Sequence, residues 1–265
     1  PEPIVTIPWK RQGAVAPTAL GPARMQLHQA SHIVQSHGRS LLIERDDDSH
    51  ATMTWHPGLG ALMGETAHHH RVGVRVADMT LLWTDADDRV LDEYALDGHT
   101  FDDATAWLRE HLGRNAAAHT LQVPYELPEH PIDTGEAFRL DDPAAFQELA
   151  QWYGNTAAAL QHVAESEPEA GAVRCWPHHL DIATLLLLEG APGSEEAVTI
   201  GAGLSPGDDT FAEPYAYVTP WPYPIPDTWP PLSPGVWYTD TFVAGVLTGT
   251  ELVDGTDAEE QERLM

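Results

Sequence analysis

The sequence is poor in cysteine, in lysine and in long apolar runs, and each shortage excludes something. Cys175 is the only cysteine among 265 residues, so no disulfide forms within the chain, as expected in a reducing cytoplasm. No apolar run approaches the roughly 20 residues that a membrane-spanning helix needs. The first residues lack the apolar core of a signal peptide. We therefore expect a cytoplasmic protein without a membrane partner.

Basic residues are scarce beside acidic ones. Thirteen Lys and Arg face 41 Asp and Glu, Lys10 is the only lysine, and the formal net charge is -28. Nucleic acid is disfavoured as a partner, because phosphate binding needs clustered Lys and Arg. Two interpretations remain open. A GC-rich genome explains the replacement of Lys by Arg, whereas adaptation to high salt also explains the negative charge, since dense carboxylates stay hydrated while salt screens their repulsion.

The order of periodic segments predicts an α+β fold of two packed antiparallel sheet-and-helix units. In the first half we expect a helix at 19–37 with Leu27, Ala30 and Val34 on one side, strands at 40–45, 51–56 and 68–77, and a hairpin at 79–96. A second helix is expected at 99–115, with Thr100 as its N-cap. In the second half we expect a helix at 140–167 capped by Asp142, strands at 172–190, 196–205, 213–220 and 235–240, and helices at 239–249 and 257–265.

The division into units follows from a proline-containing stretch without periodicity. We place an N-terminal unit at 1–120, a linker at 121–140 and a C-terminal unit at 141–265. Each half begins with a helix and places a Trp-His element early in its sheet, which suggests an ancient duplication. Eight prolines between Pro214 and Pro234 predict an extended, aromatic-rich wrap over a sheet edge, part of it lining a cleft.

The stretch RCWPHHLDIATLLLL, residues 174–188, carries the densest polar signal. Read as one strand, it places His178 on the core face with Trp176, and His179 with Asp181 on the other. The second pair would be roughly 6–7 Å apart at Cα, which suits two ligands of one metal or a carboxylate that orients an imidazole. A hydrogen-bonded core histidine and a purely structural His–Asp pair are the alternatives.

A third ligand is predicted at Glu213, which leads a later strand. Together, His179, Asp181 and Glu213 would make a His-plus-two-carboxylate set that suits Zn²⁺, Mn²⁺ or Fe²⁺. Asp208 lies in SPGDD, whose residues are equally typical of a turn that satisfies its own backbone donors.

Two groups of residues resemble a known family. The motifs WPHHLDIA and GLSPGDDTFAEPYAYVTPWPYP, with the helix DPAAFQELAQWYGNTAAAL before them, are similar to the bacterial family catalogued as domain of unknown function 5996. In the first half, LHQASHIVQ and TWHPG resemble its helix and its first sheet motif. The resemblance covers most of the chain from Gln26 to Tyr238. It implies no particular reaction.

Two functions are compatible with these motifs. The first is an enzyme, metal-dependent or not, whose pocket is formed by His and carboxylate groups, with His179, Asp181 and Glu213 as metal or acid/base groups. The second is a non-catalytic module that binds a small ligand or a protein. In both cases the expected binding residues are His28, Trp55, His56, His178, Asp208, Tyr215 and Trp221.

The acidic composition leads to a test of salt adaptation. We expect the thermal midpoint to be higher in molar chloride than in dilute buffer, because screening relieves repulsion among the carboxylates. Thermal melts followed by circular dichroism across a chloride series measure it. Equal midpoints at the two ends of the series would favour the GC-rich interpretation instead.

Overall fold

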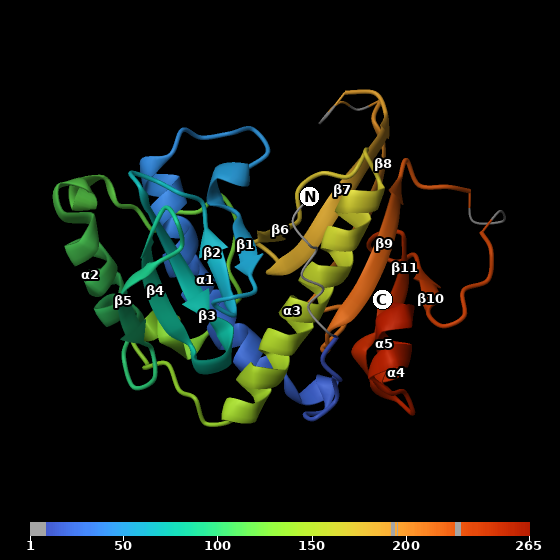
Figure 1. Ribbon diagram of the computed structural model, residues 1–265, viewed down its shortest axis with the longest axis horizontal. Coiled ribbons are helices and arrows are strands. Elements are labelled where there is room, and N and C mark those ends of the chain that lie inside the picture. The colour runs from blue at the N-terminus through green and yellow to red at the C-terminus, as the bar shows by residue number, and fades with distance from the viewer. Residues whose placement is uncertain (1–8, 192–193, 195, 226–228) are drawn as a thin grey trace. The chain divides into compact units, whose positions relative to one another are not determined.

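The computed structural model describes residues 9–191, 194, 196–225 and 229–265 and has the expected α+β class. The chain divides into two compact units (Figure 1). The N-terminal unit comprises residues 20–150 and 174–180, and the C-terminal unit comprises residues 1–19, 151–173 and 181–265. This division differs from the predicted one, because the segment 121–140 stays within the N-terminal unit. A short piece of the second half, 174–180, also belongs to that unit.

The N-terminal unit contains a long helix and a six-stranded antiparallel sheet of order β6-β1-β2-β3-β4-β5. Its elements are α1 (Gly21–Leu41), η2 (Ser49–Ala51), β1 (Met53–His56), β2 (Ala61–Gly64), β3 (His70–Arg75), η3 (Val76–Asp78), β4 (Thr80–Asp85), β5 (Val90–Ala95), α2 (Phe101–Leu112), η4 (Gly113–Ala118), η5 (Pro131–Thr134) and β6 (Arg174–Trp176). Most of the sequence predictions for this unit are therefore confirmed.

Helix α1 packs against β2 and β3 through its apolar stripe. Leu27, Ala30 and Val34, the residues expected on one side, are fully buried. Gly64 on β2 allows a close approach, because a Cβ there would lie 3.3 Å from Val34 Cγ1. Helix α2 begins at the predicted N-cap, Thr100, which forms a capping box with Asp103.

The C-terminal unit contains a five-stranded antiparallel sheet of order β7-β8-β9-β11-β10. Its elements are η1 (Pro17–Ala19), β7 (Asp181–Glu189), β8 (Val198–Ser205), β9 (Tyr215–Trp221), β10 (Val236–Tyr238), β11 (Ala244–Thr248), α4 (Gly249–Val253) and α5 (Ala258–Leu264). The boundary between the units falls within α3 (Pro143–Ser166). Asp142 caps α3 as expected, since its Oδ1 accepts from the backbone N–H of Ala144 at 3.2 Å.

Two element predictions are wrong, both in short apolar runs where helix and strand periods cannot be told apart. Residues 40–45 were expected as a strand, but α1 continues to Leu41 and the rest is loop. Residues 239–249 were expected as a helix, but Ala244–Thr248 form strand β11. There Ala244 and Val246 alternate as buried residues while the strand pairs with β9 and β10 on its two sides.

The continuous strand predicted through the histidine pair is also wrong. β6 ends at Trp176, four turn residues follow, and β7 begins at Asp181. The turn is closed by the Leu180 N–H, which donates to the Trp176 carbonyl at 2.7 Å, and Leu180 has a φ of 60°. Pro177 cannot donate a ladder hydrogen bond, which favours this interruption. The predicted alternation of side chains across Trp176–Asp181 is therefore absent.

The proline-rich stretch is only partly strand. Pro220 and Trp221 end β9, and Trp229 donates from its indole N–H to the Pro224 carbonyl at 3.2 Å. The predicted wrap includes residues 226–228, which lie outside the described residues.

The crossing of α1 and η2 gives a stability test at Gly38. A Cβ there would lie 2.3 Å from the His50 carbonyl oxygen. We expect Gly38→Ala to lower the free energy of unfolding by about 1–3 kcal/mol, although alanine is the better helix former. Urea unfolding measures this change. Gly21→Ala is the matched control, because nothing lies within 4 Å of a Cβ at Gly21; an equal effect of both substitutions would contradict the steric explanation.

Candidate functional site

A polar stripe runs along α1 on the N-terminal unit. It consists of Arg24, His28, Gln35 and Arg39, which the helical period places on one side of the helix. His28 is the only one of the four that the sequence predicted as a binding residue. The other three were missed. We call this set the α1 polar stripe.

His28 holds the turn that carries the histidine pair. Its side chain is buried, and its Nε2 lies 2.8 Å from the carbonyl oxygen of Pro177. A carbonyl only accepts hydrogen bonds, so Nε2 carries the proton. Burial lowers the pKa of His28 to about 4, against the opposing effect of the Pro177 carbonyl. His28 is therefore neutral, and it holds the turn through its hydrogen bond to Pro177.

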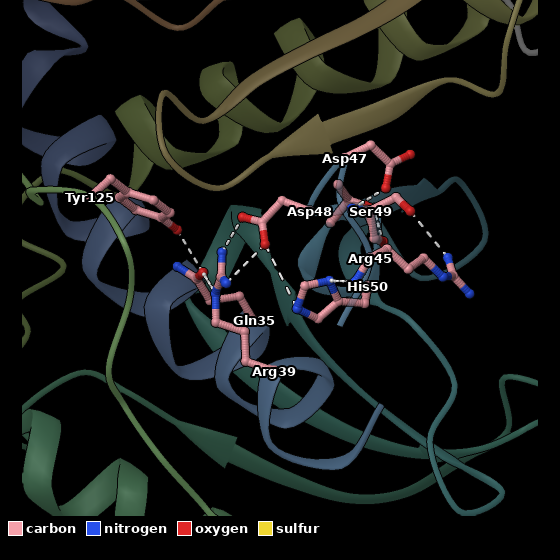
Figure 2. A network of polar contacts seen from close by, with 9 residues as sticks. Gln35, Arg39, Arg45, Asp47, Asp48, Ser49, His50 and Tyr125 are labelled. Carbon is pink, nitrogen blue, oxygen red and sulfur yellow. Dashed lines mark hydrogen bonds and ion pairs between the residues drawn. The ribbon is translucent and has the colours of Figure 1, made fainter. Parts of the chain in front are cut away.

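The C-terminal part of the stripe belongs to a polar network (Figure 2). Arg39 forms a two-point ion pair with Asp48, with Nη1 and Oδ1 2.9 Å apart, and the Arg39 side chain is only 8% exposed. The carboxylate of Asp48 also lies 3.7 Å from Nε2 of His50. Tyr125 donates its hydroxyl to Gln35 Oε1 at 2.6 Å.

Tyr125 is fixed by two side chains of α1, one at its ring and one at its hydroxyl. The guanidinium carbon of Arg39 lies 5.6 Å from the ring centroid, within the range of a cation–π contact. Burial raises the pKa of Tyr125 above its ordinary value, so the phenol stays protonated and donates to Gln35. The network thus places an aromatic ring at a defined position beside the turn 177–180.

Four ring side chains meet at this turn, and we call them the ring cluster: Tyr125, Trp176, His178 and His179. The ring centroid of His178 lies 5.7 Å from that of Tyr125, 6.3 Å from that of Trp176 and 4.5 Å from that of His179. His179 is exposed and the other three are half-buried. The ring cluster therefore places one exposed imidazole, that of His179, beside three half-buried rings.

The other predicted residues of the N-terminal unit lie on β1. His56 accepts from the Leu59 N–H at Nδ1, and its Nε2 lies 3.5 Å from Asp88. Nδ1 must be unprotonated to accept, so the ring is fixed by its own turn. Trp55 is half-buried on the same strand. His56 thus has a local structural partner on each ring nitrogen.

The predicted carboxylates belong to the C-terminal unit and have hydroxyl partners. Tyr217 donates to Asp181 at 2.5 Å, and Tyr215 donates to Asp208 Oδ2 at 2.6 Å. Burial, and then the hydrogen bond to Asp208, raise the pKa of Tyr215, so this phenol remains a donor. The ring centroids of Tyr215 and Tyr217 are 6.1 Å apart. The structure thus places Asp181, Asp208 and Tyr215 in one group.

Asp208 also has the turn role considered from the sequence. Its Oδ1 accepts from the backbone N–H of Thr210 at 2.7 Å and of Phe211 at 2.9 Å. Glu213 caps the first turn of α4, since its Oε2 accepts from both the backbone N–H and the hydroxyl of Thr250 at 2.6 Å. Asp208 therefore satisfies donors of its own turn, and Glu213 satisfies donors of a residue 37 positions later.

The predicted metal set is not formed in the part of the chain that the structure describes. Among those residues, no group of three or more His, Cys, Asp or Glu side chains is placed to hold a metal ion. Asp181 and Glu213 instead accept short hydrogen bonds from Tyr217 and Thr250, within the C-terminal unit. Trp221, a predicted pocket wall, is 47% exposed and contacts Tyr223 edge-on at 5.1 Å between centroids.

Comparison with known proteins adds no identification. No family model matches the chain, and no curated protein or solved structure is significantly similar to it. The resemblance to domain of unknown function 5996 stays a prediction. Across the described ranges, no helix is both long enough and apolar enough to cross a membrane.

Buried histidines give the N-terminal unit a defined pH dependence. Burial lowers the pKa of His28 and of His37 to about 4, and neither ring nitrogen of His37 has a hydrogen-bond partner among the described residues. The unfolded chain binds protons at these sites below about pH 6.5, before the folded chain does, so stability falls as the pH drops from 6.5 towards 4. We expect a loss of about 1 kcal/mol per histidine between pH 7 and 5.5.

Urea unfolding at a series of pH values checks this loss. The variant His37→Phe removes one titrating group while keeping a ring against Trp83, whose centroid lies 5.6 Å from that of His37. Its stability is expected to fall less steeply over the same pH range. Parallel curves for the two proteins would refute the assignment to His37.

Proposed function

We propose that the N-terminal unit is a non-catalytic module that binds a small molecule with a flat ring at the ring cluster. The observation that carries the proposal is the gathering of four ring side chains, one exposed and three half-buried, around one turn of the unit. Aromatic faces stack on flat ligands, and the exposed imidazole of His179 offers a hydrogen-bond donor and an acceptor.

Pre-organisation supports this proposal. The turn is closed by its own backbone hydrogen bond and held from beneath by His28, while Tyr125 is fixed by Gln35 and Arg39. Few side chains therefore have to be ordered when a ligand arrives, which lowers the entropic cost of binding. The same local rigidity has no evident use in a turn that only connects two strands.

Binding is favoured over metal-dependent catalysis for a chemical reason. The carboxylates proposed as metal or acid/base groups already accept short hydrogen bonds from Tyr217 and Thr250. His179 and His178 remain beside aromatic rings, where recognition of a ligand needs no metal. A protein-binding module at the same turn is the alternative, and probes of small size distinguish the two.

The test uses indole and adenosine as flat-ring probes. Saturation-transfer difference NMR on the full chain is expected to show both probes binding, and Trp176→Leu is expected to weaken binding about tenfold, through the loss of one stacking face. Trp221→Leu is the matched control, since Trp221 is an exposed tryptophan of the C-terminal unit.

Two results would contradict the proposal. One is the absence of saturation transfer to either probe at millimolar concentration. The other is an equal loss of binding in Trp176→Leu and Trp221→Leu, which would indicate non-specific contact with exposed tryptophans.

A further inference from the structure

Arg24 is a half-buried cation that forms no ion pair with a carboxylate among the described residues. Its Nε is fully buried and has no hydrogen-bond partner among the described residues, and the contact recorded for Nη2 is with Met25 Sδ at 3.6 Å. Every other arginine that is not exposed pairs with an acid. These arginines and their partners are Arg39 with Asp48, Arg71 with Asp88, Arg75 with Asp78 and Glu93, and Arg174 with Glu65.

An arginine without an acid is unusual in this chain. Acids outnumber bases by 41 to 13, so a nearby carboxylate is the expected partner of any half-buried guanidinium. Arg24 also lies in the first turns of α1, and the first turn of this helix contains no acid. A cation is unfavourable at the positive end of a helix dipole. The burial of a guanidinium without an acid and its position at the positive end of the helix dipole are both unfavourable. A bound anion would offset both effects.

The position of Arg24 connects it to the ring cluster. It precedes His28 by one helical turn on the α1 polar stripe, and His28 holds Pro177 in the turn that carries His179. Both Arg24 and His179 are near enough to His28 to lower its pKa, after the larger effect of burial. Arg24 and His179 thus lie near the same buried imidazole.

We propose that the ligand of the ring cluster carries a carboxylate or phosphate group and that Arg24 binds this group. This inference rests on the proposed function, because it names the class of ligand for the same site. A guanidinium suits both groups, since its planar N–H donors match two oxygens of a carboxylate or a phosphate. A ring compound with an acidic substituent would then contact the ring cluster with its flat part and the α1 polar stripe with its charge.

The first experiment compares charged and neutral probes with the same ring. Indole-3-acetate is paired with indole-3-acetamide, and adenosine monophosphate with adenosine, so carboxylate and phosphate are tested separately. We expect the acidic member of at least one pair to bind roughly tenfold more tightly to the native chain. Arg24→Gln is expected to remove that difference while leaving the neutral probe unchanged. Arg114→Gln, which removes an exposed charge from the same unit, is the control.

The second experiment does not depend on ring binding. Inorganic phosphate is compared with chloride at equal ionic strength, and the thermal midpoint is measured for the native chain, Arg24→Gln and Arg114→Gln. Phosphate at about 100 times its dissociation constant is expected to raise the midpoint by several degrees in the native chain and in Arg114→Gln, but not in Arg24→Gln. Without phosphate, Arg24→Gln is expected to be at least as stable as the native chain, because it removes an unpaired charge.

The outcomes separate the two proposals. If the neutral probes bind and the acidic probes bind no more tightly, the role of Arg24 is overturned and the ring cluster remains a binding site. A phosphate effect that depends on Arg24, with no binding of neutral rings, would support the anion site and overturn the ring proposal. A marked loss of stability in Arg24→Gln alone, without phosphate, would show that an acid of the chain pairs with Arg24 and would overturn the inference.

Discussion

The hydrogen bond from buried His28 to the Pro177 carbonyl is the constraint on which the candidate site depends. Residues 174–180 belong to the second half of the chain yet form part of the N-terminal unit. The pairing of β6 with β1 does little to hold this segment, since their register is given by one residue pair, Met53 with Cys175. Arg174 adds bonds to Thr52 and Glu65 from one end of the segment. At the other end of the segment, the hydrogen bond of His28 to Pro177 holds the turn, so the backbone that carries the ring cluster is fixed.

Local signals in the sequence predicted most of the helices and hairpins. The Thr100 capping box, the Asp142 cap and the stripe of Leu27, Ala30 and Val34 each act within a few residues, so one sequence suffices to read them. The turn after Trp176 could not be read in this way. Pro177 is its one local signal, and the hydrogen bond that holds the turn comes from His28, on a helix 149 positions earlier.

The candidate site was predictable only in part, for the same reason. His28, His178 and His179 were identified as residue types, and the structure places all three at one turn. Gln35 and Arg39 escaped notice because their partners, Tyr125 and Asp48, are known only from the fold. The hydroxyl donors to Asp181, Asp208 and Glu213 could not be predicted either, because the sequence pattern does not connect them to these carboxylates.

The distribution of basic residues explains why the carboxylates of the two units have different kinds of partner. Ten of the twelve arginines lie in the N-terminal unit, where arginines that are not exposed pair with carboxylates, apart from Arg24. The C-terminal unit has three basic residues, and its half-buried carboxylates instead accept from tyrosine and threonine hydroxyls. Hydroxyl donors satisfy a carboxylate without neutralising it, so this unit keeps its negative charge. An acidic ligand would be repelled there, and the guanidinium that has no acid of its own lies in the other unit.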